Sequence, residues 1–254
     1  MVESALVIPD CHIPWHDKKA WDLMLEIAQF QNDLLPLKEI IILGDFADCY
    51  AVSLHSKLPS HLQMTPRKFT DELSEAYYHL KQLRDTFPGA EIIYLEGNHE
   101  ARMQKYIIKN CETIAPYIKT LPEILHLDSM NIRWVPYGRH QLYPVLNSNL
   151  YARHAPWDGG KHTARGSVDK GHISLLFGHT HRKQRATATR ADKEEIECFS
   201  MGWLGDEDAE IFDYMDKSNW SKSFGFVFKH KDNTFVDVVD IKKNMAQYHG
   251  QIYT

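Results

Sequence analysis

Short apolar runs that end abruptly at polar residues recur along the first two thirds of the chain. They span residues 4–8, 39–43, 90–95, 150–153 and 173–177. Runs of this length, rich in β-branched residues and bounded by Gly, Pro or Asp, are typical of buried strands. We therefore predict strands at these positions, each followed by carboxylate, amide or imidazole groups.

Between these runs, apolar residues recur with the period of a helix. The clearest cases are residues 17–30, with one stripe formed by Trp21, Leu25 and Ala28, and residues 67–87, whose stripe comprises Phe69, Leu73, Tyr77, Leu80 and Leu83. Strands alternating with helices indicate βαβ units and a mostly parallel sheet. In such sheets ligands gather beyond the carboxyl ends of the strands, where the polar groups of this chain fall.

The pattern changes after residue 181. Residues 184–190, 195–199, 224–230 and 235–241 resemble strands joined by polar turns, and we expect a meander that forms or completes a second sheet. Residues 50–66 and 110–130 look irregular or short-helical, and insertions of that length are often the walls of a binding site. We expect one domain over residues 1–254.

Composition narrows the class of protein without naming a substrate. The chain has 254 residues, 43% of them hydrophobic, a net charge of -5 and only four scattered cysteines. These values give no sign of a nucleic-acid coat protein, a membrane-surface binder or a disulfide framework. No apolar run approaches the length of a membrane span, and the N-terminus does not resemble a signal peptide, so we expect a soluble cytoplasmic protein with no membrane partner.

Two pairs of residues have spacing that suits metal binding. Asp10 and His12 alternate by two within an extended segment, so both side chains can point to the same face, and His179 and His181 repeat this spacing. Imidazole and carboxylate together suit Mn²⁺, Fe, Zn²⁺ or Ni²⁺ better than Ca²⁺. A hydrolytic metal centre follows as the natural hypothesis.

The order of motifs resembles that of the calcineurin-like metallophosphoesterases. The matching segments are DCH at 10–12, GDFAD at 44–48, GNHE at 97–100, a lone His154 after a strand, and GHTH at 178–181. The resemblance implies an α/β (α+β) fold, a four-layer αββα sandwich in which helices flank two mixed β-sheets. It also implies a metallophosphoesterase domain with two divalent metal ions, for which Mn²⁺ is our first choice and Fe, Zn²⁺ and Ni²⁺ are alternatives.

The same resemblance assigns roles to individual residues. Asp10, His12 and His181 would hold one metal, Asn98, His154 and His179 would hold the other, and Asp45 would bridge the two. In isolation Asn98 could be a turn residue and Asp45 a helix N-cap.

The resemblance also implies how the reaction proceeds. A hydroxide shared by the two metals would attack phosphorus in line. His99 would be the catalytic imidazole, and Asp48 would orient it, with a solvated loop carboxylate as the alternative for Asp48. We interpret Glu100 as an acid in a first helical turn.

One position departs from the serine/threonine phosphatase branch of this family. There the second Asp of GDxxD is followed by an arginine that binds phosphate, whereas this chain has Cys49. A thiol cannot replace a guanidinium that binds phosphate through two hydrogen bonds, so protein phosphatase activity is disfavoured. Arg102 and Arg165 are the candidates to contact substrate instead, although surface or ion-paired roles compete.

Several further residues carry no motif of their own. His162 lies in a glycine-rich loop after His154, and His16, His55 and His61 read as ordinary loop histidines. Four aromatic residues in loop-like stretches either wall the site, stack on a base or pack in the core, namely Trp157, Trp203, Tyr214 and Trp220.

Taken together, the sequence predicts a hydrolase that acts on phosphoric ester bonds, either mono- or diesters. The partner would be a phosphorylated substrate. A nuclease of the same superfamily, with nucleic acid as substrate, is the alternative. A non-catalytic scaffold that retains the fold is the alternative of another class, although such proteins have usually lost metal ligands and all seven are present here.

Overall fold

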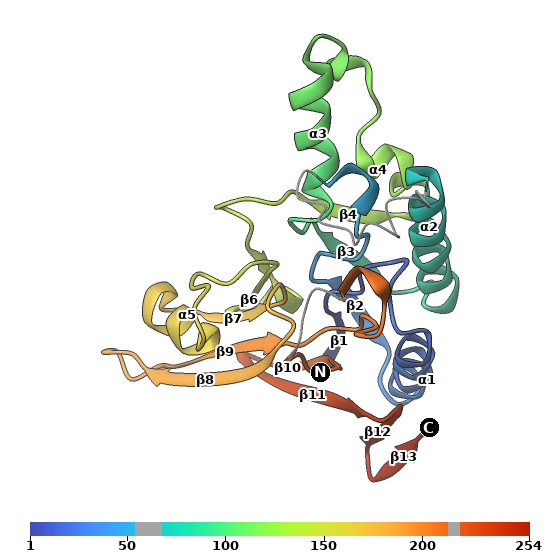
Figure 1. Ribbon diagram of the computed structural model, residues 1–254. Coiled ribbons are helices and arrows are strands. Elements are labelled where there is room, and N and C mark those ends of the chain that lie inside the picture. Colours follow the sequence, from blue (N-terminus) through green and yellow to red (C-terminus); the bar gives the residue numbers. More distant parts are fainter. Residues whose placement is uncertain (54–67, 213–218) are drawn as a thin grey trace.

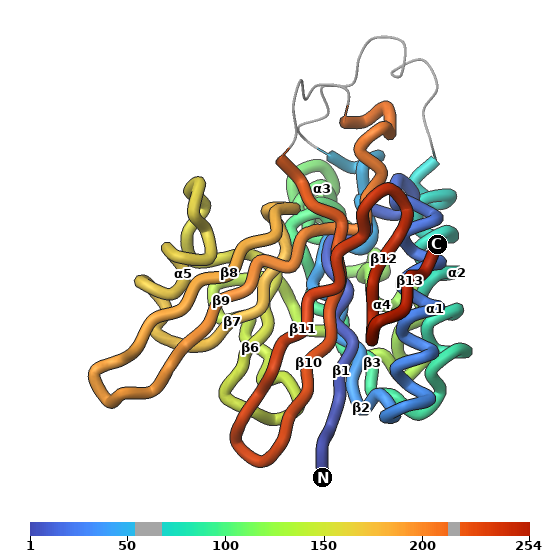
Figure 2. Tube along the Cα trace, turned by 90° about the horizontal axis from the view of Figure 1, so that it is seen from below, coloured from blue at the N-terminus to red at the C-terminus, as the bar shows by residue number. Residues whose placement is uncertain are grey.

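Two β-sheets stacked face to face form the centre of the molecule, with helices on the outer face of each (Figure 1). The computed structural model describes residues 1–53, 68–212 and 219–254. In Figure 2 the order of layers is α5, the smaller sheet, the larger sheet, then α1 and α2. The four-layer αββα sandwich expected from the sequence is confirmed.

The larger sheet has eight strands in the order β13-β12-β11-β10-β1-β2-β3-β4. In chain order they are β1 Val2–Ile8, β2 Leu37–Ile42, β3 Glu91–Leu95, β4 Ile132–Val135, β10 Ser223–His230, β11 Asn233–Lys242, β12 Met245–Tyr248 and β13 Gln251–Tyr253. Strands β1 to β4 are parallel, and β10 pairs antiparallel with β1. The carboxyl ends of β1, β2 and β3 therefore lie side by side.

The smaller sheet has five strands in the order β5-β6-β7-β9-β8. They are β5 Tyr143–Pro144, β6 Leu150–Arg153, β7 Ser174–Phe177, β8 Lys183–Thr189 and β9 Glu195–Met201. The central strands β6, β7 and β9 are parallel, and the outer strands β5 and β8 are antiparallel to their neighbours. Both sheets are therefore mixed.

The helices connect these strands and cover the sheets. The α-helices are α1 Lys18–Leu34, α2 Phe69–Thr86, α3 Ala101–Cys111, α4 Leu121–Ile124 and α5 Thr163–Gly171. The 3-10 helices are η1 Tyr50–Val52, η2 Glu112–Tyr117, η3 Asp128–Met130, η4 Val145–Asn147 and η5 Glu210–Phe212. Asp17 caps α1, since its carboxylate accepts hydrogen bonds from the backbone N–H groups of Lys19 and Ala20 at 3.0 and 3.1 Å.

Three apolar clusters correspond to the three interfaces between layers. On β2, Ile40 and Ile42 pack with the helices α1 and α2, whereas Ile41 between them faces the other sheet. Successive side chains of a strand point to opposite faces, so a strand covered on both sides is apolar throughout. The third cluster lies under α5, where Val168 packs near Phe177 of β7.

The four strands after residue 181 do not form one meander, so that part of the prediction is wrong. Strands β8 and β9 complete the smaller sheet, but β10 and β11 join the larger one beside β1. The burial of these strands explains why they belong to different sheets. Strand β8 is exposed or half-buried at every position and suits an edge, whereas β10 is buried at its first five residues and needs cover on both faces.

The two predicted insertions have different outcomes. Residues 110–130 form the end of α3, η2, α4 and η3, and four of their side chains join the core beside α2, namely Leu121, Leu125, Leu127 and Met130. Of residues 50–66, only 50–53 lie within the described chain. A role for either segment as a site wall stays a prediction. Among the described helices, none is both long and apolar enough to cross a membrane.

Candidate metal centre

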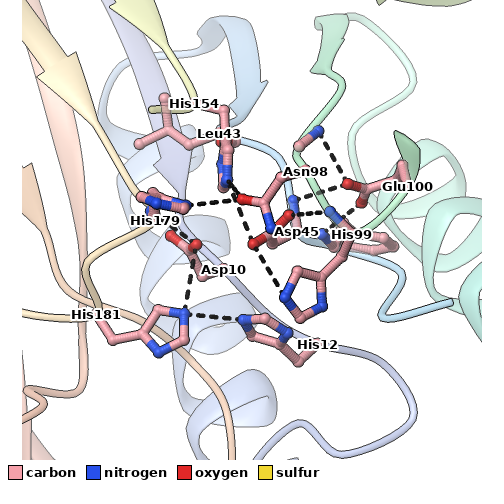
Figure 3. Close-up of polar contacts among 12 residues, drawn as sticks. Asp10, His12, Leu43, Asp45, Asn98, His99, Glu100, His154, His179 and His181 are labelled. Atoms are coloured by element: carbon pink, nitrogen blue, oxygen red, sulfur yellow. Dashed lines mark hydrogen bonds and ion pairs between the residues drawn. The ribbon is translucent and has the colours of Figure 1, made fainter. Parts of the chain in front are cut away.

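Polar side chains from both sheets meet beyond the carboxyl ends of the parallel strands (Figure 3). The loops after β1, β2 and β3 supply residues from the larger sheet, and those after β6 and β7 supply residues from the smaller one. The seven predicted ligands all lie here, and each is connected to another by a short contact. They are Asp10, His12, Asp45, Asn98, His154, His179 and His181.

Four of these residues form the first group that could hold a metal ion. Each of Asp10, His12, Asp45 and His181 is buried and offers one ligand atom, and these atoms lie within 4.8 Å of one another. Nε2 of His12 is 2.9 Å from Nε2 of His181, and the latter atom is 3.6 Å from Oδ1 of Asp10.

The second group shares Asp45 with the first. Oδ2 of Asp45 is 3.3 Å from Nε2 of His154, and His179 completes the set. Oδ1 of Asn98 lies between the two imidazoles, 2.9 Å from Nε2 of His154 and 2.7 Å from Nδ1 of His179. Asp45 is thus the residue through which the two groups touch.

The hydrogen bonds behind the predicted ligands leave acceptor atoms that face one another. The Nδ1–H of His154 donates to the carbonyl oxygen of Leu43 at 2.7 Å, so in the neutral ring the lone pair of Nε2 faces Asn98 Oδ1. Asp10 Oδ2 is buried and has no hydrogen-bond partner among the described residues. A metal ion bound between such acceptor atoms would satisfy them. The hydrogen bond from His154 to Leu43 fixes which ring nitrogen carries the proton.

The pKa values of three predicted ligands are shifted by burial and by neighbouring charges. Burial raises the pKa of Asp10 to about 8, with a further contribution from the charge of Asp45. Burial would lower the pKa of His154, but Asp45 raises it to about 9. Burial and His154 lower the pKa of His179 to about 4, so that ring is neutral at pH 7. Metal binding would replace protons on Asp10 and His154 and is therefore favoured as the pH rises.

Several predicted ligands occupy left-handed backbone, which is uncommon for residues with a side chain. The φ angles are 53° at His12, 47° at Asp45, 67° at His179 and 56° at His181. Backbone of this kind carries a cost and concentrates at functional sites, because the surrounding structure must hold it. Here the sharp turns direct these four side chains into the two groups that share Asp45.

Two glycines make room for ligand carboxylates. A Cβ atom at Gly97 would come within 2.2 Å of Oδ1 of Asp45, and one at Gly178 would come within 2.1 Å of Oδ2 of Asp10. Neither position can carry a larger residue without displacing a predicted ligand.

Asp48 connects two histidines rather than one. Its Oδ2 accepts from Nδ1 of His99 at 2.9 Å, as the proposed dyad requires, and also from Nδ1 of His12 at 2.7 Å. Burial would raise the pKa of Asp48, but His99 and His12 hold it well below its usual range, so the group stays ionised. Asp48 therefore fixes the tautomer of a predicted ligand and of the predicted catalytic imidazole.

Arg102 extends this network from α3. Its Nη1 donates to the carbonyl oxygen and to Oδ1 of Asp48, both at 2.9 Å, and its Nη2 lies 2.8 Å from Nε2 of His99. The last contact requires a neutral His99 ring, whereas Asp45 and Asp48 together overcome burial and raise the pKa of His99. The protonation of His99 thus depends on where Arg102 points.

The interpretation of Glu100 as a first-turn acid is wrong. Its side chain is 1% exposed and turns away from its own helix to the loop after β2. Oε1 accepts from the N–H groups of Phe46 and Ala47, and Oε2 accepts from those of Asp45 and Gly97, at 2.7 to 3.0 Å. The Tyr94 hydroxyl adds a fifth bond at 2.7 Å. This role was missed because three of the five partners of Glu100 lie more than 50 residues earlier in the sequence. The acid directly after GNH was the only signal in the sequence.

Two of the tryptophans named in the sequence analysis, Trp203 and Trp220, pack against the site. Trp203 is 1% exposed and stacks on His181 at 4.8 Å, and Trp220 meets the same ring edge-on at 4.5 Å. Trp157 lies at α5, where Arg153 contacts its ring face. Tyr214 lies outside the described residues.

Arg165 and His162 are placed at α5. Arg165 is 58% exposed and pairs with Asp169 one turn later at 2.8 Å. His162 is exposed at the start of the same helix. The described structure connects neither of them to the two ligand groups.

The described structure is thus an αββα sandwich in which Asp, His and Asn side chains that could hold metal ions gather at the strand ends. The chain belongs to the calcineurin-like phosphoesterases, whose family model matches residues 4–183. This range contains every predicted ligand and the His99 and Asp48 pair.

Two solved structures are similar to this chain at low sequence identity. Vacuolar protein sorting 29 from Cryptosporidium parvum has 11% identity and a TM-score of 0.45, and the match covers 100% of this chain and 98% of that one. The nuclease MPE from Pseudomonas putida has 13% identity and a TM-score of 0.37, with 91% and 86% covered. A comparison with curated proteins finds no significant match. Likeness at this level does not bear on activity.

Proposed function

We propose that this protein is a hydrolase that cleaves phosphate mono- or diesters with the help of two divalent metal ions. The observation that carries the proposal is the convergence of seven ligand side chains in two groups that share Asp45, with the His99 and Asp48 pair beside them. A scaffold without activity has no need of a complete ligand set and an oriented imidazole together.

The ligand residues define what the metals would do. Asp10, His12 and His181 would hold one ion and Asn98, His154 and His179 the other, with Asp45 between them. Divalent ions in such a site lower the pKa of bound water and polarise a phosphoryl oxygen. Mixed imidazole and carboxylate ligands favour Mn²⁺ first, with Fe, Zn²⁺ and Ni²⁺ as alternatives.

His99 is proposed to move a proton at the leaving oxygen. Its side chain is 17% exposed, so it can reach a substrate, while Nδ1 is held by Asp48. The ionised carboxylate stabilises the imidazolium, and Nε2 is then the atom that donates to the leaving group. Nε2 is 3.7 Å from Oδ2 of Asp45, which places it beside the shared ligand.

Arg102 is proposed to bind the substrate phosphate. It would replace the arginine that the serine/threonine phosphatase branch has at the position of Cys49. Cys49 is fully buried and cannot reach a ligand, whereas the Arg102 side chain is 23% exposed and already lies against Asp48 and His99. A phosphate would compete for the guanidinium and release Nε2 of His99 for proton transfer. Arg165, which is paired at the surface, is the weaker candidate.

Replacing Arg102 with alanine should therefore weaken substrate binding. A hydrogen bond to a charged group contributes about 1.5 to 3 kcal/mol, so kcat/KM should fall by about 10- to 100-fold, mostly through KM. Arg102→Lys should recover only part of the loss, because lysine cannot form two parallel hydrogen bonds. Steady-state kinetics at saturating Mn²⁺ measure both parameters.

The control for this variant is Arg133→Ala on β4, an arginine whose side chain is 62% exposed. It should keep the KM of the unaltered protein. An unchanged KM in Arg102→Ala would contradict the phosphate role, and full recovery by lysine would show that only charge matters.

The substrate class is tested with a panel of phosphate esters. With Mn²⁺ present, we expect hydrolysis of an aryl monoester or an aryl diester, abolished by a chelator and restored by added metal. A phosphopeptide, a 2′,3′-cyclic nucleotide and single- and double-stranded DNA complete the panel. Preference for DNA would favour the nuclease alternative. A protein that holds its metals and hydrolyses none of these compounds would support the scaffold alternative.

A further inference from the structure

A second pair of histidines has the geometry of a ligand pair but lies outside the metal centre. His16 follows β1, and His79 lies on α2. Their ring centroids are 4.4 Å apart with the planes at 75°. The pairs within the metal centre are similar, with 4.8 Å and 80° for His12 and His181.

Three of the four ring nitrogens of this pair are buried without a hydrogen-bond partner among the described residues. His16 is 4% exposed and His79 is 8% exposed. Within the described chain, neither ring nitrogen of His16 has a hydrogen-bond partner, and Nδ1 of His79 also lacks one. Buried polar atoms are nearly always paired, and an exception needs an explanation such as an ion.

A carboxylate completes the set. Glu75 precedes His79 by four residues on α2, which places both on the same face of the helix. One ligand atom each from His16, Glu75 and His79 lies within 4.8 Å of the others. Burial lowers the pKa of His16 to about 3 and also lowers the pKa of His79, so both rings are neutral at pH 7. Neutral imidazole is the form that binds metals.

We propose that His16, Glu75 and His79 bind one divalent transition-metal ion, Zn²⁺ by preference, at a site separate from the proposed phosphoesterase centre. Two imidazoles and a carboxylate form a ligand set that Zn²⁺ uses, with a fourth position left for water. The ion would join the segment after β1, which carries His12 four residues earlier, to α2.

A cavity that opens to solvent lies against one residue of this site. A cavity of about 470 Å³ borders His16, and its wall includes the carboxylates Asp206 and Asp208 beside Lys18 and Lys19. The bound ion would stabilise the loop after β1 by linking it to a helix that lies far from it in sequence. This role is independent of phosphoester hydrolysis, so either proposal can fail without the other.

The number of bound zinc ions tests the proposal. Native mass spectrometry and elemental analysis should find one Zn²⁺ fewer in His79→Gln than in the unaltered protein. Glu75→Gln should weaken binding at that site at least tenfold by chelator competition, and it keeps the proposal testable if the histidine variant does not fold. Loss of the ion should also lower the thermal midpoint measured in the presence of Zn²⁺.

The matched control is His126→Ala. His126 is exposed and contacts Tyr77 of α2 but belongs to none of the ligand groups of the described structure. It should bind as many ions as the unaltered protein. Equal zinc content in the unaltered protein and both site variants would overturn the proposal, and so would an equal loss in the control.

Discussion

Replacing His99 with alanine is expected to lower kcat by about 10²- to 10⁴-fold, the usual contribution of a general acid or base. The metal content should not change, because Nδ1 of His99 is bonded to Asp48 and the ring belongs to neither of the two groups that share Asp45. Elemental analysis and turnover of the same preparation measure both quantities.

The dependence on leaving group separates proton transfer from other roles. An ester with a good leaving group needs little protonation of its leaving oxygen. The rate of its hydrolysis should therefore fall much less in His99→Ala than the rate for an alkyl ester. The control is His230→Ala, an exposed histidine at the end of β10. Equal losses for both esters would reject proton donation, and a loss of metal would make His99 a ligand instead.

Replacing Glu100 with glutamine is expected to cause the largest loss of stability among these variants. In the unaltered protein each carboxylate oxygen of Glu100 accepts from two backbone N–H groups, for example those of Asp45 and Gly97. In the variant the NH₂ group of glutamine would face one such pair and could not accept from it. Each buried donor left without a partner costs about 1 to 3 kcal/mol, so the free energy of unfolding should fall by about 2 to 5 kcal/mol. Urea denaturation of the metal-free protein measures it.

The same variant should also bind metal less tightly, because Glu100 holds the left-handed turn that presents Asp45. The control Glu26→Gln lies on the exposed face of α1 and should stay within about 0.5 kcal/mol of the unaltered protein. A decrease below about 1 kcal/mol in Glu100→Gln would show that the loop does not depend on this carboxylate.

Much of the fold could be predicted from local sequence. Strand β6 begins and ends at the residues predicted from the apolar run, and α1 begins after Asp17, the residue at which the predicted helix starts. The bounds of β6 and the start of α1 depend on residues close by in the sequence. An apolar run marks the strand, and the Asp17 cap marks the helix. By contrast β10 could not be assigned to a sheet, because its partner β1 lies more than 200 residues earlier.

The sequence likewise indicated the predicted metal ligands of the candidate site but not the contacts that support them. Local spacing indicated the pairs Asp10 with His12 and His179 with His181, and the family resemblance added the remaining ligands. Neither source indicated that Asp48 also binds His12, or that Arg102 contacts His99. The first contact joins loops that follow the different strands β1 and β2, so it exists only after the sheet has formed. The second joins residues three positions apart at the start of α3, but the direction of the Arg102 side chain depends on its bonds to Asp48.

The sequence by itself determined which residue types end each strand and, through their order, the family of the protein. Only the tertiary structure decided which groups support them. It turned Glu100 from its own helix to the loop that carries Asp45, and it paired His16 with His79. The physical reason is that ligand types follow from local chemistry, whereas buried hydrogen bonds and ion sites depend on distances between segments that only packing fixes.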